Sequence, residues 1–252
     1  MMRGADQVKA THSYLKYSIL SLAALAAAPV AHAESLGVED VSCLVEPGRL
    51  AILSSQLPGV IDEIQVAPGD SVSRGDTLFT LKREVEQASR SLEVARAEYA
   101  GRRLQRNQRM IEQGMLSDSE ADELNTDLRV ARLQGELAAA QLDQRTSQAP
   151  FDGVITQQHA EQGEYIDATP VLELAQLDPL KIEAVLPLVA YGSVAVGDVY
   201  EVALASPVER RVSAEVSRVD SIIDASSGTF VIELRLDNPD GEIPAGINCQ
   251  LS

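Results

Sequence analysis

The sequence predicts a mainly β protein in which an α-helical coiled-coil hairpin interrupts a split β-sandwich, followed by a small β-barrel. Three observations support this class. The β-rich stretch at residues 53–82 is too short to enclose a core by itself. A second stretch, residues 149–176, repeats its pattern after a long, charged, alanine-rich segment at residues 83–148. Short runs of alternating apolar and polar residues then fill residues 177–252 and are typical of a small barrel or sandwich.

The first 33 residues have the pattern of a cleavable signal peptide. Basic residues precede an apolar run at residues 19–30, and Ala31-His32-Ala33 fits a small-x-small cleavage site. The run is short for a bilayer span, although an uncleaved membrane anchor is the alternative. We therefore expect an exported chain that starts near Glu34, with an N-terminal strand in residues 34–52 that joins the barrel.

The two β-rich stretches share a spacing of glycines and apolar residues. Gly59-Val60-Ile61 opens the first and Gly153-Val154-Ile155 opens the second, and another glycine follows ten residues after each leading one. Two halves that are apolar on one face can pair into a flattened sandwich that neither forms alone. Glycine suits turns that need a positive φ or a close backbone approach. The predicted turn glycines are Gly59, Gly69, Gly75, Gly153 and Gly163.

The segment between the halves predicts two helices with coiled-coil spacing. Apolar residues alternate by three and four in each helix, as at a helix–helix seam. In the first helix these are Val85, Ala88, Leu92, Ala95 and Tyr99. In the second they are Leu124, Leu128, Ala131, Ala138 and Leu142, with Gly135 at one position. A second stripe on that helix (Val130, Leu133, Leu137 and Ala140) either meets a neighbouring copy or a partner, or only widens the seam.

A turn near residue 115 separates the two helices. Gly114 suits the position just after a helix end, and Ser117 with Glu120 forms a Ser-x-x-Glu capping box for the next helix. Each arm holds about thirty residues, so the arms extend about 45 Å at 1.5 Å per residue. These features predict an antiparallel hairpin with a defined tip.

The phrases "GVIDEIQVAPGDSVSRGDTL" and "APFDGVI" resemble the two lipoyl half-motifs of periplasmic adaptor subunits, the membrane fusion proteins of the HlyD-like family. The resemblance implies a lipoyl/biotinyl-like sandwich cut open by the hairpin. It also implies a function, namely to link an inner-membrane transporter of the RND (resistance-nodulation-division) type to a TolC-like outer-membrane channel for export of small molecules. Self-association, as a hexamer by family analogy, and a place in the periplasm beside the inner-membrane pump follow from the same resemblance. An adaptor for an ABC-type exporter is the nearest alternative.

The hairpin tip carries a second likeness to this family. Family tips that meet the channel show Arg-x-x-x-Leu, six further residues and Ser, and here Arg106, Met110 and Ser117 have that spacing with Met in place of Leu. The resemblance implies that these three residues contact the outer-membrane channel. In the alternative interpretation, Arg106 pairs with acids across the hairpin, Met110 belongs to the seam, and Ser117 only caps the helix.

Other functional classes find less support. A lipoyl or biotinyl carrier-type enzyme component presents a lysine in the turn between its halves, but residues 83–148 contain no lysine, and Lys82 leads directly into helical sequence. We therefore expect no cofactor. Beyond the leader, His159 is the only histidine, and we found no nucleophile elbow or phosphate loop. We expect no metal site and no catalytic residue, which disfavours a metal- or ligand-binding periplasmic protein. A net charge of −17 argues against nucleic acid.

Two cysteines lie near the ends of the mature chain, Cys43 and Cys249. In an oxidising compartment such a pair is a disulfide candidate. Two buried free thiols are the alternative.

Overall fold

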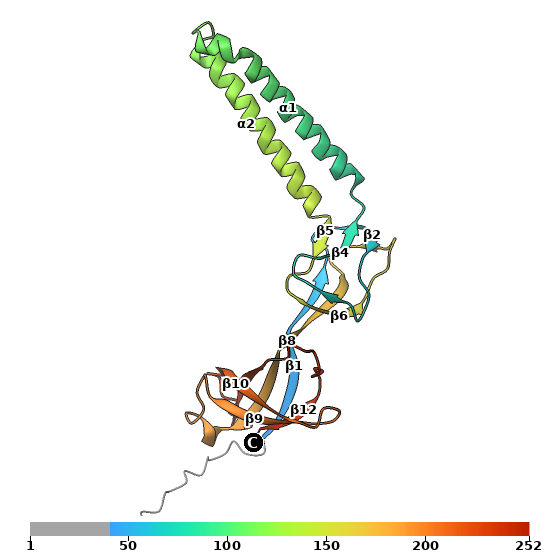
Figure 1. Ribbon diagram of the computed structural model, residues 1–252, viewed down its shortest axis with the longest axis vertical. Coiled ribbons are helices and arrows are strands. Elements are labelled where there is room, and N and C mark those ends of the chain that lie inside the picture. Colours follow the sequence, from blue (N-terminus) through green and yellow to red (C-terminus); the bar gives the residue numbers. More distant parts are fainter. Residues whose placement is uncertain (1–40, 252) are drawn as a thin grey trace, which may run out of the picture. The chain divides into compact units, whose positions relative to one another are not determined.

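The computed structural model describes residues 41–251, so the predicted signal peptide lies outside the described residues. The predicted fold class is confirmed: the chain is mainly β, with two long helices inserted between strands (Figure 1). The strands are β1 (Val41–Ser54), β2 (Gly59–Ile64), β3 (Ser71–Val72), β4 (Thr77–Leu81), β5 (Thr146–Gln148), β6 (Gly153–Gln158), β7 (Tyr165–Ile166), β8 (Pro170–Pro187), β9 (Val199–Leu204), β10 (Arg211–Val219), β11 (Thr229–Leu236) and β12 (Asn248–Leu251). The helices are α1 (Glu84–Glu112), α2 (Asp118–Asp143) and the 3₁₀ turn Leu188–Ala190.

The two halves are joined by strand pairs, each made of one strand from either half. Strand β2 of the first half pairs with β7 of the second, and β3 of the first pairs with β6 of the second. The exchange is reciprocal at the glycines: the Gly69 amide donates to the Ile155 carbonyl at 2.8 Å, and the Gly163 amide donates to the Ile61 carbonyl at 2.9 Å. Neither half can therefore complete its hydrogen bonds without the other.

Burial alternates identically in the two halves. In β2 and in β6, the third residue is fully buried and the next two are exposed. The buried residues, Ile61 and Ile155, lie in one apolar core together with Leu78, Phe79 and Leu172. This shared core explains why the spacing of the two β-rich stretches is the same.

A closed six-stranded barrel forms the second apolar core. Its strands follow the order β1, β12, β9, β10, β11 and β8, and pairing of β8 with β1 closes the ring. Phe230, Ile232 and Leu234 of β11 point into it, as inward residues of a strand do at a period of two. Closure leaves this sheet without a free edge.

The long strands β1 and β8 belong to both cores. Leu174 of β8 lies in the sandwich core, whereas Leu180 of the same strand lies in the barrel core. Strand β1 pairs with β8 along both stretches, with a shift of register between Pro47 and Arg49. The boundaries that we placed at residues 52/53 and 176/177 therefore fall inside continuous strands, because strand pairing extends from one core into the other.

The helical hairpin is shorter than predicted at its C-terminal end. We assigned residues 83–148 to it, but Thr146–Gln148 form β5, which pairs with β4 at the edge of the sandwich. A three-residue polar strand has no periodicity of its own and is defined only by its partner.

The seam of the hairpin was predicted correctly on α2 and wrongly on α1. Leu124, Ala131 and Ala138 of α2 are buried as expected. On α1, however, all five predicted seam residues are exposed. The half-buried residues of α1 are instead Glu86, Glu93, Ala97, Ala100, Gly101, Arg103, Leu104, Asn107 and Ile111. Helix α1 therefore carries two stripes of similar spacing, and the more apolar one lies outside the seam.

Candidate functional site at the hairpin tip

The tip is a tight turn built from the last residues of α1. The Met115 amide donates to the Met110 carbonyl at 2.8 Å, and the Gly114 amide donates to the Ile111 carbonyl at 3.0 Å. Gly114 has a φ of +66°, so this pair of bonds is the Schellman ending that glycine favours. The carbonyls at the end of α1 are thus satisfied locally, and the turn has a fixed backbone.

Ser117 caps α2 as the sequence predicts. Its hydroxyl accepts a hydrogen bond from the Glu120 amide and donates one to the Glu120 carboxylate at 2.7 Å. The carboxylate also accepts from the Ser117 amide at 2.9 Å. Bonds from the Ser117 backbone, and then from its side chain, lower the pKa of Glu120. Ser117 thus has a demonstrated structural role, and its contact with a channel stays a prediction.

Arg106 and Met110 lie one helical turn apart on α1, and both are exposed. The pairing across the hairpin that the alternative interpretation gives to Arg106 is made by a neighbour, because Arg103 forms an ion pair with Asp127 at 2.9 Å. Within residues 41–251, Arg106 has no ion pair. With Met115, which is 62% exposed, and Arg109, which is also exposed, the tip presents two guanidinium groups and two flexible thioethers to solvent. Methionine adapts well to a contact surface.

The base of the hairpin is fixed by an arginine that the sequence did not single out. Arg145 donates from Nε and Nη2 to the Glu86 carboxylate, at 3.1 and 2.7 Å, and from Nη1 to the Pro58 carbonyl at 2.9 Å. It therefore joins the last residues after α2 to the first turn of α1 and to the chain before β2. One arginine among the many of this helical segment gives no sequence signal, since its role depends on contacts with distant residues.

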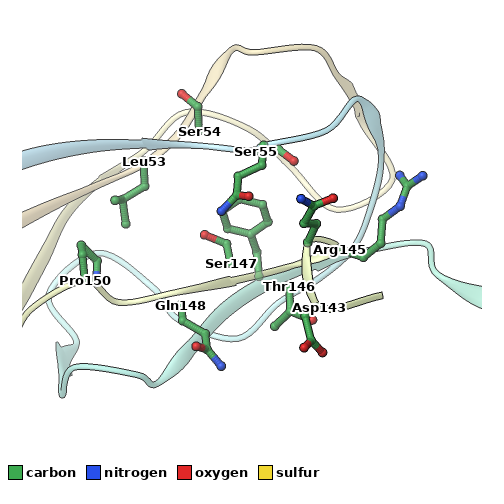
Figure 2. A pocket seen from close by; sticks show the side chains of 12 residues that line it. Leu53, Ser54, Ser55, Asp143, Arg145, Thr146, Ser147, Gln148 and Pro150 are labelled. Carbon is green, nitrogen blue, oxygen red and sulfur yellow. The ribbon is translucent and has the colours of Figure 1, made fainter. Parts of the chain in front are cut away.

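A pocket of about 420 Å³ lies beside this arginine (Figure 2). Most of its lining side chains are polar, among them Ser54, Ser55 and Gln148, while Leu53 and Pro150 supply apolar contacts. The pocket lies between the end of β1 and the edge strand β5.

The five predicted turn glycines divide into two groups. Gly69, Gly75 and Gly163 have positive φ angles of 97°, 93° and 85°. Gly59 and Gly153 were wrongly assigned to turns, because they are the first residues of β2 and β6. Position 153 needs a glycine for a different reason, because a Cβ there would lie only 2.4 Å from the Ala175 carbonyl oxygen.

Cys43 and Cys249 form a disulfide, with their Cα atoms 4.8 Å apart. They lie directly opposite each other on the paired strands β1 and β12. Both are buried in the barrel core. The bond therefore joins the first and last strands of the described chain.

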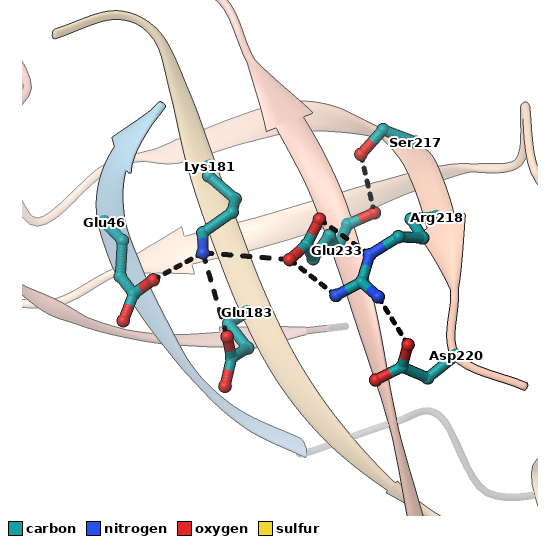
Figure 3. Close-up of polar contacts among 7 residues, drawn as sticks. All are labelled: Glu46, Lys181, Glu183, Ser217, Arg218, Asp220 and Glu233. Atoms are coloured by element: carbon teal, nitrogen blue, oxygen red, sulfur yellow. Dashed lines mark hydrogen bonds and ion pairs between the residues drawn. The ribbon is translucent and has the colours of Figure 1, made fainter. Parts of the chain in front are cut away.

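An ionic cluster covers one side of the barrel, across β1, β8, β10 and β11 (Figure 3). Lys181 lies 2.8 Å from Glu46, 3.7 Å from Glu233 and 3.9 Å from Glu183. Arg218 binds Glu233 through two nitrogens, at 3.0 and 2.7 Å, and also pairs with Asp220. Its hydrogen bonds lower the pKa of Glu233, and the bond to Glu46 raises the pKa of Lys181.

The cluster offsets the repulsion between two glutamates that the strand register places opposite each other. Glu183 and Glu233 lie directly opposite each other on β8 and β11, and like charges at such positions destabilise a sheet. Lys181 and Arg218 neutralise them. Sequence reasoning missed this cluster because the register of the strands is not visible in the sequence.

Comparison with known proteins identifies the architecture. The model of the CzcB-like, barrel-sandwich hybrid domain matches residues 49–175, about half of the chain. The chain belongs to this family. The match covers both clasped halves and the hairpin between them, and it confirms the resemblance to periplasmic adaptor, or membrane fusion, proteins.

Individual relatives of this CzcB-like chain are distant. It is 27% identical over 216 residues to nodulation protein NolF of Rhizobium meliloti, and the matched region covers 80% of this chain and 59% of that protein. It is 26% identical over 224 residues to the nickel-cobalt-cadmium resistance protein NccB of Alcaligenes xylosoxydans xylosoxydans, covering 79% and 56%. The chain thus spans little more than half the length of these relatives.

Among solved structures, the chain resembles a MacA-MexA chimeric protein that contains the MexA α-hairpin domain of Pseudomonas aeruginosa. The TM-score is 0.71 at 17% identity, covering 84% of this chain and 78% of that one. At this identity the likeness shows the fold. None of the described helices has the length and apolar character to cross a membrane.

Proposed function

We propose that this CzcB-like chain is the periplasmic adaptor subunit of a tripartite efflux pump. It would link an inner-membrane transporter of the RND type to a TolC-like outer-membrane channel for export of small molecules, with several copies, six by family analogy, around the path of export. The signal peptide would deliver it to the periplasm. In this proposal it performs no catalysis and needs no cofactor.

The exposed hairpin tip is the observation that carries the proposal. Helices α1 and α2 pack on each other, and Arg145 fixes their base, yet Arg106, Met110 and Met115 at the other end are exposed. Exposed methionines beside a cation suit a contact that adapts to a partner and is oriented by hydrogen bonds. We infer that Arg106 donates to the channel, that Met110 packs on it, and that Ser117 adds a contact to its capping role.

Site-specific photocrosslinking in cells tests this contact. A photoreactive residue at Met115 should capture an outer-membrane channel, identified by mass spectrometry in the outer-membrane fraction. A matched control at Val189, on the barrel and 80% exposed, should not capture it. Arg106→Ala should reduce the Met115 adduct. Identical adducts from both positions, or no channel adduct at Met115, would contradict the proposal.

The proposal names an RND transporter as the inner-membrane partner, and an ABC-type exporter is the alternative. The same experiment addresses it, because mass spectrometry of inner-membrane adducts formed from barrel positions should identify a large permease in the first case. An ATP-binding cassette protein in its place would support the alternative. The name of NccB suggests metal cations as one substrate class to assay beside organic compounds.

A further inference from the structure

The sulfur atoms of the described chain lie in two contrasting environments. Cys43 and Cys249 are bonded to each other and buried, and residues 41–251 hold no free cysteine. The thioethers belong to Met110 and Met115, which are 41% and 62% exposed at the hairpin tip. The other two methionines of the sequence are its first two residues, within the predicted signal peptide. After cleavage, the tip therefore carries all the sulfur that an oxidant in solution can reach.

The backbone of the tip holds its shape without help from the two thioethers. The Met115 amide donates to the Met110 carbonyl at 2.8 Å, and Gly114 completes the helix ending with a φ of +66°. Ser117 and Glu120 begin the next helix through side-chain and backbone bonds. These contacts involve amides, a carbonyl, a hydroxyl and a carboxylate, and no sulfur atom. A chemical change at sulfur would therefore alter the surface of the tip and leave its scaffold in place.

Met110 occupies the position at which the adaptor tip motif has leucine. Leucine and methionine offer a similar apolar volume to a partner, but only the thioether can accept an oxygen atom. Two-electron oxidation converts methionine into a sulfoxide, which is polar and disrupts contacts that depend on methionine. Methionine at this position thus makes the contact sensitive to oxidants, whereas leucine would keep it apolar under all conditions.

A sulfoxide at Met110 would also have a cation within reach. Arg106 lies four residues earlier on α1, so the two side chains are neighbours on one face of the helix, and both are exposed. A guanidinium donates hydrogen bonds, and the sulfoxide oxygen accepts them. Oxidation would therefore remove an apolar contact and also give the Arg106 guanidinium an acceptor within the tip, in competition with the channel.

We propose that Met110 and Met115 form a reversible oxidation site that regulates docking of the tip. The inference rests on the adaptor function proposed above. In the oxidation step, the sulfur lone pair attacks one oxygen of a peroxide and the O–O bond breaks. The sulfur becomes a sulfoxide and loses two electrons, and the other peroxide oxygen is reduced and leaves as water. A methionine sulfoxide reductase reverses the step, because two thiols supply two electrons and the sulfoxide oxygen leaves as water.

Mass spectrometry of the purified mature chain tests the site itself. Hydrogen peroxide should add one oxygen atom to Met110 and one to Met115, at a rate close to that of the chain unfolded in urea. The melting midpoint in circular dichroism should not change, and methionine sulfoxide reductase with a dithiol should remove both oxygens. Met110→Leu/Met115→Leu should gain no oxygen. Much slower oxidation of the folded chain, or a lower melting midpoint afterwards, would overturn the site.

Photocrosslinking to outer-membrane vesicles of the same bacterium tests the effect on docking. The chain carries a photoreactive residue at the exposed Gln113, and it is oxidised and freed of peroxide before mixing, so that the oxidant never meets the channel. Oxidation should lower the yield of channel adduct at least about tenfold, because a polar group enters an apolar contact. Treatment with the reductase should restore it. In Met110→Leu/Met115→Leu, the yields before and after peroxide should be equal.

A variant that imitates the sulfoxide separates this inference from the proposed function. Met110→Gln/Met115→Gln should lose the adduct without any oxidant, whereas the control Ile222→Gln, at a barrel position that is 82% exposed, should keep it. An adduct that survives both oxidation and the glutamine pair would overturn the regulation and leave the adaptor function standing. If the unoxidised chain forms no channel adduct, the tip contact is wrong and its regulation by oxidation is wrong with it.

Discussion

At the scale of single residues, glycine serves two different physical needs in the clasped halves. Gly69 and Gly163 have positive φ, and each directs its amide to a strand of the other half. Gly153 has an ordinary backbone conformation, and the space beside it is filled by the Ala175 carbonyl. A glycine spacing in the sequence therefore marks both turns and close approaches, and only coordinates distinguish them.

Replacing Gly153 should cost stability. We expect Gly153→Ala to lower the free energy of unfolding by about 1–3 kcal/mol, as overpacking does. Gly135 of α2 is a matched control, because nothing lies within 4 Å of its missing Cβ. Gly135→Ala should therefore raise stability by about 0.5–1 kcal/mol through helix propensity. Urea denaturation of both variants checks this, and equal effects would contradict it.

At the scale of elements, the hairpin depends on contacts at its two ends as well as on its seam. The Schellman ending and the capping box close the tip. At the base, the fork of Arg145 binds both Glu86 and the carbonyl of Pro58. A guanidinium thus joins the first turn of α1 to the chain just after α2.

A lysine at position 145 should not be able to make the contacts of the arginine. In Arg145→Lys the charge is kept but the bidentate contact is lost. We expect amide hydrogen exchange to become roughly tenfold faster in the first turn of α1 and the last turn of α2, equivalent to about 1.4 kcal/mol. Arg90→Lys, at an exposed position farther along α1, should change nothing. Unaltered exchange in Arg145→Lys would show that the base is held in another way.

The disulfide between β1 and β12 leads to a second prediction at this scale. Replacing both Cys43 and Cys249 by Ala should lower stability by about 2–4 kcal/mol, because the bond restricts the unfolded chain. Reduction of the unmodified protein should lower the melting midpoint in circular dichroism, and reductant should have no effect on the double variant. An unchanged midpoint after reduction would count against a stabilising bond.

At the scale of the whole described chain, two cores share the strands β1 and β8. A shared strand couples the cores through backbone pairing, whereas a loop would leave them independent. The ionic cluster of Lys181 and Arg218 lies across four barrel strands, including both of these. Lys181 and Glu233 are partly buried, so their interaction is less screened than that of exposed pairs.

Removal of Lys181 should therefore destabilise in a pH-dependent way. At pH 7 we expect Lys181→Met to cost about 1–2 kcal/mol, because three carboxylates lose their common cation. The pKa of Glu233 lies below its ordinary 4.5 in the folded state, chiefly because Arg218 binds it and in smaller part because Lys181 lies near it. The part of this contribution that comes from Lys181 is present above about pH 4.5 and is lost as the pH falls further. The raised pKa of Lys181 keeps its own contribution until the pH rises past 10.5.

Thermal melts of Lys181→Met and the parent protein between pH 3.5 and 9 check this. The difference in midpoint should be largest near neutral pH and should shrink toward the acid limit. Lys82→Met, at an exposed lysine, is the control and should have no effect at any pH. A deficit that does not vary with pH would point to lost packing of the lysine stem instead.

The sequence alone determined the mainly β class, the inserted hairpin, the seam of α2 and the cap at Ser117, because each depends on residues close together in the chain. A period of three and four, a Ser-x-x-Glu box and a repeated glycine spacing are local signals. Only the tertiary structure decided which α1 stripe faces α2, that Gly153 approaches Ala175, and that Arg145, Glu86 and Lys181 hold distant segments together. These outcomes depend on strand register and on helix rotation, where competing arrangements have similar local energies and the choice falls to contacts between residues far apart in the chain.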